Sequence, residues 1–241
     1  FDLVIDHHRE APKSSFKGVY INLKAGSCCA TIYELVREYG LKFEADNEAD
    51  AFVATALAVG IASDTEMMCS PDTTHYETSV WTEILDYRNP NLLAQIINFE
   101  IPKIWVEKKA SAVGNVKVSD GVAVFGLGII DKKHRDLIAD MADDLRKWED
   151  VNTSVVYAII DGKRIEGSVR SVNAALTISA VCKELGETKG GSGGGKLGKG
   201  AYSYELSGGS IDDSDPDDIK TKLQTAFNER EKLRIERHLK K

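Results

Sequence analysis

The chain has 241 residues, of which 42% are hydrophobic and 29% are charged, as expected of a soluble globular protein with room for two domains. No run of 18 apolar residues occurs, which excludes a membrane-spanning helix of the usual kind. The net charge of −7 argues against a protein that binds long nucleic acid through a basic face. The four cysteines include no C-x-x-C pair, so a zinc or thioredoxin-like motif has no support and reduced thiols in the cytoplasm are expected.

Strands and helices alternate over the first hundred residues. Apolar runs predict strands at 2–6 and 19–23, and helical periodicity predicts helices over 27–40 and 46–62 and from Pro71 onward. Asp46 is the expected cap of the second helix, which is apolar nearly all round and therefore buried. This alternation predicts part of a doubly wound parallel sheet, in which functional residues gather at the carboxyl ends of the strands.

A second α/β unit is expected after a connection at residues 90–115, which contain Pro90 and Pro102. Helices are predicted over 132–148 and 173–186. The predicted strands are 121–127, 153–160 and 164–171, and a glycine-rich loop over 190–200 leads into a further strand. We therefore expect one domain at residues 1–100, with a linker to about residue 117, and a smaller mixed-sheet domain at residues 118–241 that ends in a helix.

Asp6, His7 and His8 follow the first predicted strand directly. Carboxylate and neutral imidazole together suit Mn, Zn, Fe or Co. Because adjacent side chains on a strand point to opposite faces, one histidine can bind a metal while the other faces a substrate. A pair of surface histidines at a strand end is the alternative interpretation.

Three further features suit phosphate chemistry. Asp64, in "GIASDT", follows a buried helix, where a carboxylate is hydrated, capping or ligating. Arg170, in "GSVRS", suits bidentate recognition of phosphate. The loop from Gly190 to Gly200 exposes backbone amides that can cradle an anion, and Lys196 adds positive charge. A turn cap, an ordinary strand arginine and a flexible linker are the respective alternatives.

The segments "DHH", "GIASDT", "GSVRS" and "GGSGGGKLGKGA" occur in this order at domain-scale spacing. In this combination the chain resembles the DHH phosphoesterases, and among them the oligoribonuclease and phosphoadenosine-phosphate phosphatase branch. The resemblance covers the chain apart from its far C-terminal helix. It implies the C-terminal part of a DHH phosphoesterase domain followed by a DHH-associated substrate-binding domain.

The resemblance also implies roles for the first group of residues. His7 and Asp64 match two ligands of one metal ion. His8 matches the histidine that faces the scissile phosphate, and Asp6 matches the acid that positions this pair.

In the second domain, Arg170 and the run Gly193, Gly194 and Gly195 match the substrate clamp of the family. Lys196 stands where the family has a histidine. A lysine neutralises phosphate as a point charge but does not act as a base near neutral pH, so the resemblance leaves the choice of substrate open.

The function that the resemblance implies is hydrolysis of a phosphoester. Two divalent cations, Mn²⁺ or alternatively Mg²⁺ or Co²⁺, would activate a water for attack on phosphorus. Short oligonucleotides or 3′-phosphorylated nucleotides fit the acidic chain best, with polyphosphate and cyclic dinucleotides as alternatives. Two upstream family motifs, H-x-x-x-D-x-D and a further Asp, have no match, so we expect a segment to precede Phe1 and the chain alone to be inactive.

Two other classes of function stay open. Without the upstream ligands the chain would be a nucleotide-binding module that catalyses nothing. Alternatively, it would be a structural subunit that forms a homodimer through its C-terminal helix. Ile219, Leu223 and Phe227 form a stripe on that helix, which serves either an interface or packing within the chain.

Overall fold

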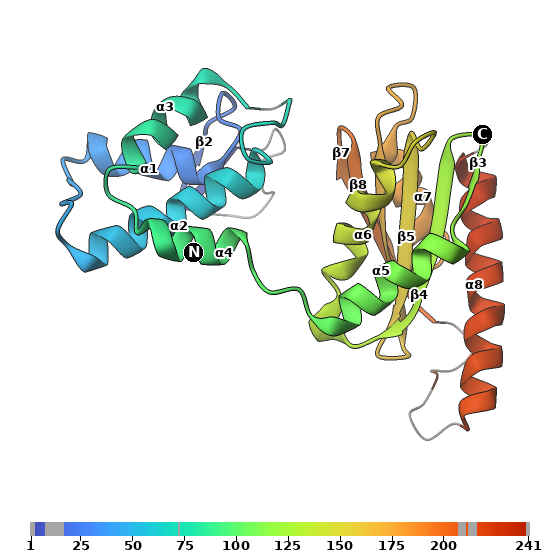
Figure 1. Cartoon of the computed structure of the whole chain (residues 1–241). Coiled ribbons are helices and arrows are strands. Elements are labelled where there is room, and N and C mark those ends of the chain that lie inside the picture. The colour runs from blue at the N-terminus through green and yellow to red at the C-terminus, as the bar shows by residue number, and fades with distance from the viewer. Residues whose placement is uncertain (1–2, 8–16, 72, 207–210, 212–215, 240–241) are drawn as a thin grey trace. The chain divides into compact units, whose positions relative to one another are not determined.

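The structure, a computed structural model, describes residues 3–7, 17–71, 73–206, 211 and 216–239. It divides the chain into two compact units, residues 1–100 and residues 101–241 (Figure 1). The first contains a two-stranded parallel sheet and the second a six-stranded mixed sheet, each with helices, so the predicted α/β fold class is confirmed. Within the described residues, no helix combines the length and the apolarity needed to span a bilayer.

The first unit packs four helices around a parallel strand pair. Its elements are β1 (Leu3–Asp6), β2 (Gly18–Ile21), α1 (Cys28–Glu38), α2 (Glu48–Asp64), α3 (His75–Ile84) and α4 (Pro90–Ile97). Asp6 is opposite Ile21 in the parallel register, so both strands end at the same edge. The core lies between α1, α2 and α3, where Tyr33, Ile61 and Ile84 are almost completely buried.

Two helices in this unit begin later than the sequence predicted. The side chain of Asn47, rather than Asp46, caps α2, because its Oδ1 accepts a hydrogen bond from Ala49 N–H at 2.9 Å. Helix α3 begins beyond Pro71, because Thr74 and Glu77 form a capping box that fixes its first turn. In both cases a better side-chain acceptor lies a few residues after the expected cap.

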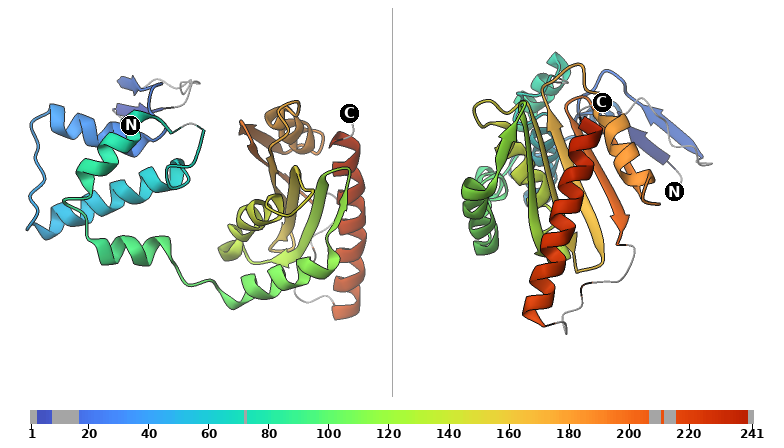
Figure 2. Two further views of the ribbon diagram at one scale, coloured as in Figure 1. Left: turned by 45° about the horizontal axis from the view of Figure 1, so that its top comes forward. Right: turned by 90° about the vertical axis from the view of Figure 1, so that its right-hand side faces the viewer.

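The second unit is a sheet with helices on both faces. Its elements are α5 (Lys103–Asn115), β3 (Lys117–Ser119), β4 (Val122–Ile130), η1 (Lys132–His134), α6 (Leu137–Arg146), β5 (Thr153–Ile160), β6 (Arg164–Ser171), α7 (Ile178–Glu187), β7 (Ser192–Lys196), β8 (Lys199–Glu205) and α8 (Asp217–Leu239). The strand order is β3-β4-β5-β6-β8-β7; β4 and β5 are parallel and the other neighbours are antiparallel. Figure 2 shows α5 and α6 on one face and α7 and α8 on the other.

Alternation along β5 explains the two layers of the core. Val156 and Ala158 pack with α5 and α6, whereas Val155, Tyr157 and Ile159 pack with α7 and α8. All eight residues of β5 are buried, as expected of a central strand covered on both sides.

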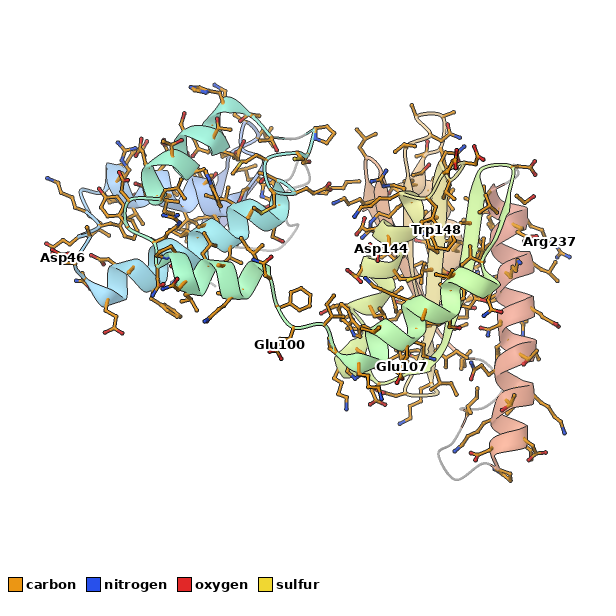
Figure 3. The ribbon with its side chains drawn as sticks, in the orientation of Figure 1. Asp46, Glu100, Glu107, Asp144, Trp148 and Arg237 are labelled. Atoms are coloured by element: carbon orange, nitrogen blue, oxygen red, sulfur yellow. The ribbon has the colours of Figure 1, made fainter. Side chains whose placement is uncertain are left out.

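Residues 103–115, which the sequence analysis assigned to the connection, form helix α5 of the second unit. Trp105 and Ala112 are buried in its core. Lys109 Nζ lies 2.6 Å from carboxylate oxygens of both Asp140 and Asp144 on α6, and Asp144 is labelled in Figure 3. The N-cap is Pro102, which has no side-chain acceptor, so the sequence carries no start signal for this helix.

Helix α8 is fixed to the sheet by a buried carboxylate. Glu231 is 2% exposed and accepts hydrogen bonds from the hydroxyls of Tyr202 and Tyr204, at 2.9 and 2.5 Å. Arg234 donates to the same carboxylate at 2.8 and 3.0 Å, and its guanidinium lies 4.7 Å from the ring centroid of Tyr204. The desolvation of both tyrosines and the neighbouring Glu231 charge raise the pKa of each phenol, which keeps them protonated as donors.

The apolar stripe predicted on α8 is buried at one end and exposed at the other. Phe227 packs against the core on the α7 side of the sheet. Ile219 and Leu223, in the first half of the helix, are 43% and 38% exposed. Packing within the chain accounts for the second half of the helix.

We expect Glu231→Gln to destabilise the protein by about 3 kcal/mol, because it leaves Arg234 without its buried counter-charge. Urea unfolding followed by circular dichroism measures this. The exposed neighbour Glu229 gives a matched control, since Glu229→Gln should change stability by less than about 0.5 kcal/mol. Equal unfolding midpoints for the two variants would contradict the role given to Glu231.

Candidate functional site

Asp6 occupies the carboxyl end of β1. Its carboxylate accepts a hydrogen bond at 2.7 Å from the backbone N–H of His7, and its carbonyl accepts one at 2.9 Å from Asn22 N–H. These bonds orient Asp6 at the edge of the parallel pair, where functional groups are expected in such sheets. His7 is half-buried beside it, and His8 lies outside the described residues.

Asp64 is the last residue of α2, and the turn after it is held by Thr65. The Thr65 hydroxyl is buried, donates to Ile61 O at 2.6 Å and accepts from Met68 N–H at 3.1 Å. Glu66, Met67 and Met68 then adopt φ values of 50°, 57° and 66°, a left-handed turn that costs free energy for residues other than glycine. Thr65 makes the turn contacts, which leaves Asp64 half-buried at the helix end.

The charges of Asp6 and Asp64 both act on one thiol. Cys28 begins α1, and its Sγ donates to Ile5 O on β1 at 3.4 Å. Burial raises the pKa of the Cys28 thiol, and the charges of Asp6 and Asp64 raise it further. The sequence analysis did not single out Cys28, and its only signal is its place at a helix start.

Glu77 fixes the turn that leads into α1. Its side chain is fully buried and accepts hydrogen bonds from Gly26 N–H at 2.6 Å and from Thr74 N–H and hydroxyl at 2.8 and 2.7 Å. These bonds hold the turn before Cys28 in place. The T-x-x-E spacing of Thr74 and Glu77 is the sequence signal that would have found this contact.

The donor set around Cys28 fits a divalent cation. Carboxylate oxygens are ligands that Mg²⁺ and Mn²⁺ prefer, and Asp6 and Asp64 supply them from separate elements. Across the part of the chain that the structure describes, no group of three or more His, Cys, Asp or Glu side chains is arranged to hold a metal ion. The assignments of His7 and Asp64 as ligands of one metal ion, and of Asp6 as the acid that positions the motif, therefore stay predictions.

In the second unit, the prediction of a glycine-rich loop is wrong, because residues 192–205 form a hairpin of β7 and β8. Glycine usually disfavours strands, but here it permits a close backbone approach. A Cβ on Gly193 would lie 1.9 Å from the carbonyl oxygen of Cys182 on α7, whereas a Cβ on Gly194 would meet nothing within 4 Å. Successive residues of a strand face opposite sides, so Gly194 belongs to the face away from α7.

Three cations form a row across this face. Arg170 on β6 is opposite Lys199 on β8, which is opposite Lys196 on β7. Residues directly opposite each other share one face, and like charges placed so repel one another. The row, which we call the cation row, is therefore suited to an anion. The sequence analysis predicted Arg170 and Lys196 but could not place Lys199 between them.

The guanidinium of Arg170 is already engaged. It lies 2.7 and 3.2 Å from the two carboxylate oxygens of Asp143 on α6, and it donates to Ser168 Oγ at 2.7 Å. The Arg170 side chain is 11% exposed. Lys196, by contrast, is exposed at the end of β7. The two proposed clamp residues therefore differ in how readily a ligand reaches them.

We expect Gly193→Ala to destabilise the protein by about 1–3 kcal/mol, because the added methyl group overlaps the backbone of α7. The neighbouring Gly194→Ala has open space and should change stability by less than about 0.5 kcal/mol. Urea unfolding of the two variants compares them directly. A larger loss at Gly194 than at Gly193 would overturn the assignment of faces on β7.

Comparison with known proteins gives one domain family and several structures. The sequence matches the DHHA1 domain over residues 112–227. An exopolyphosphatase-related protein from Bacteroides fragilis has a similar structure, with a TM-score of 0.64 and 15% identity over 97% of this chain. This chain covers 65% of the length of that protein. No curated protein sequence matches.

Two other structures are less similar. A putative family II inorganic pyrophosphatase from Methanococcus jannaschii has a TM-score of 0.35 and 17% identity. The match covers 92% of this chain and 72% of the pyrophosphatase chain. A pGpG-specific phosphodiesterase from Vibrio cholerae has a TM-score of 0.37 and 16% identity. The match covers 94% of this chain and 79% of the phosphodiesterase chain. The resemblance seen in the sequence is thus confirmed for the second domain: residues 112–227 match the DHHA1 domain, and the fold is similar to that of the exopolyphosphatase-related protein.

Proposed function

We propose that the chain takes part in metal-dependent hydrolysis of short oligonucleotides or 3′-phosphorylated nucleotides. The observation that carries the proposal is that Asp6, at the carboxyl end of a parallel strand pair, and Asp64, at the end of α2, both act electrostatically on Cys28. In this proposal His7 and Asp64 bind one of two divalent cations, for which Mn²⁺ is the first candidate. His8 faces the scissile phosphate. A divalent cation bound there would supply Lewis-acid activation of water and of the phosphoryl group.

The chain's own residues would prepare this chemistry. The hydrogen bond from His7 N–H holds the carboxylate of Asp6 in a fixed orientation. Thr65 holds the left-handed turn, so Asp64 stays at the end of α2. Positioning of this kind avoids reorganisation when charge develops on the phosphoryl oxygens.

The second unit would bind the phosphate or nucleotide part of the substrate. Lys196 and Lys199 supply positive charge, and the open face at Gly194 allows a ligand to approach the backbone closely. Arg170 donates to Asp143, Ser168 and Val169 O through four of its five N–H groups, which leaves one for a ligand. All four cysteines are free thiols, which is consistent with the cytoplasmic location that forms part of the proposal.

Hydrolysis of a phosphoester panel by the full-length protein with Mn²⁺ tests the proposal, whereas residues 1–241 alone are expected to be inactive. The panel contains a 3′-phosphorylated nucleotide, a linear dinucleotide, a cyclic dinucleotide and polyphosphate. We expect turnover of one of the first two, and at least about tenfold weaker Mn²⁺ binding by calorimetry for Asp64→Asn, because a charged ligand is lost. Asp46→Asn, at an exposed acid of the same unit labelled in Figure 3, is the matched control.

Two results would contradict this assignment. The first is Mn²⁺ binding that Asp64→Asn does not weaken. The second is turnover that persists after metal removal. Nucleotide binding without turnover would instead support a binding module, and polyphosphate or cyclic dinucleotide turnover would support the corresponding alternative substrate.

We also expect Lys196→Ala to raise KM about fivefold while kcat changes little, because the loss of one exposed charge removes about 1 kcal/mol of binding in ground and transition states alike. Arg170→Ala should do more damage, since it also leaves Asp143 facing the two lysines. Steady-state kinetics on the preferred substrate measure both effects. Lys183→Ala, at an exposed lysine of α7, is the control. Unchanged KM and kcat for Lys196→Ala would contradict the proposal that the cation row binds the substrate.

A further inference from the structure

A cavity of about 340 Å³ opens on the same face of the second unit as the cation row. It lies between the start of α6 and the strands β6, β8 and β7; Figure 1 labels α6, β7 and β8. None of the family motifs in the sequence accounts for its charged residues. The residues that matter for its chemistry are Arg135, Asp136, Arg164, Glu166, Ser168 and Ser203.

The cavity presents a carboxylate between two guanidinium groups. Glu166 Oε2 lies 3.1 Å from a terminal nitrogen of Arg135, and Glu166 Oε1 lies 3.2 Å from one of Arg164. The side chain of Glu166 is 13% exposed, whereas those of Arg135 and Arg164 are 55% and 40% exposed. A carboxylate has about four acceptor positions and a guanidinium five N–H donors, so each group keeps capacity for a ligand.

The charges of the cavity cancel. Arg135 and Arg164 are balanced by Asp136 and Glu166, whereas the cation row brings together three positive charges, of which that of Arg170 is paired with Asp143. A phosphate is therefore attracted to the row rather than to the cavity. The cavity suits an uncharged group that presents hydrogen-bond donors and acceptors side by side.

The cavity and the row are continuous. The hydroxyl of Ser168 lines the cavity and accepts a hydrogen bond from Arg170 at 2.7 Å. Glu166 and Arg170 lie four residues apart on β6 and on the same face, which corresponds to about 13 Å of strand. With the reach of their side chains, this spacing suits a nucleoside monophosphate.

We propose that this cavity is a base-binding subsite selective for guanine. The guanine N1–H and exocyclic amino group would donate to the Glu166 carboxylate. Its O6 and N7 would accept from Arg135 or Arg164, a pairing that arginine makes with guanine elsewhere. Adenine instead presents an acceptor at N1, which faces a carboxylate unfavourably. The Ser203 hydroxyl is available to the sugar.

The inference rests on the proposed function only in placing the ligand's phosphate at the cation row. Equilibrium binding of GMP, AMP and inorganic phosphate to the metal-free protein tests it without any turnover. We expect GMP to bind at least about tenfold more tightly than AMP, because two hydrogen bonds to a charged acceptor are at stake. Lys196→Ala should weaken GMP and AMP binding by the same factor.

Variants of the cavity identify the source of the preference. Glu166→Gln should lower the GMP affinity about tenfold and leave AMP binding nearly unchanged, and Glu166→Asp should restore part of the loss. Arg135→Ala replaces an exposed side chain and so remains informative if the Glu166 variants unfold; it should reduce the preference for GMP as well. Glu187→Gln, at an exposed site on α7, is the control.

Equal affinity for GMP and AMP would overturn the inference, as would a GMP preference that survives both Glu166→Gln and Arg135→Ala. Either result leaves the phosphoesterase proposal untouched, because no hydrolysis is measured. Conversely, an inactive phosphoester panel together with an intact GMP preference would overturn the hydrolytic function and retain the guanine subsite.

Discussion

The close approach of α7 to the glycine-rich strand β7 determines which face of the sheet in the second unit stays accessible to a ligand. The carbonyl of Cys182 lies where a side chain at Gly193 would be, so the helix backbone rests directly on the strand. With α7 and α8 covering this face, and α6 packed over β5 and β6 on the other, the opposite face of β8 and β7 carries no helix among the described elements. The cation row and the cavity lie on that face because helix packing leaves it accessible.

Buried carboxylates fix the elements around each site. Glu77 ties the turn before α1 to the start of α3, and Glu231 ties α8 to β8 through Tyr202 and Tyr204. Each carboxylate accepts at least three hydrogen bonds, which offsets the cost of removing its charge from water. Neither of these two acids belongs to a motif of the DHH family, yet they hold in place the turn before α1 and the contact between α8 and β8.

The sequence predicted the α/β class and the order of the motifs, but not where the motif residues meet. Asp6 and Asp64 are 58 positions apart, and only the tertiary fold lets the charges of both act on Cys28. The glycine run looked like a loop because its composition is that of a flexible segment, whereas its strand conformation comes from the neighbouring helix. Lys199 joins Arg170 and Lys196 through strand register, which local sequence does not encode.

Asp143 gives Arg170 a role that the motif alone does not reveal. The carboxylate binds the Nε–Nη2 edge of the guanidinium and Ser168 binds Nη1, so Arg170 is oriented before any ligand arrives, at the cost of neutralising part of its charge. In the proposed site a phosphate at the row would therefore be attracted mainly by the two lysines, while Arg170 would contribute one directed hydrogen bond. Since Arg170 also donates to Ser168, which lines the cavity, this fixed arginine is the structural link between the phosphate and base portions of the proposed ligand site.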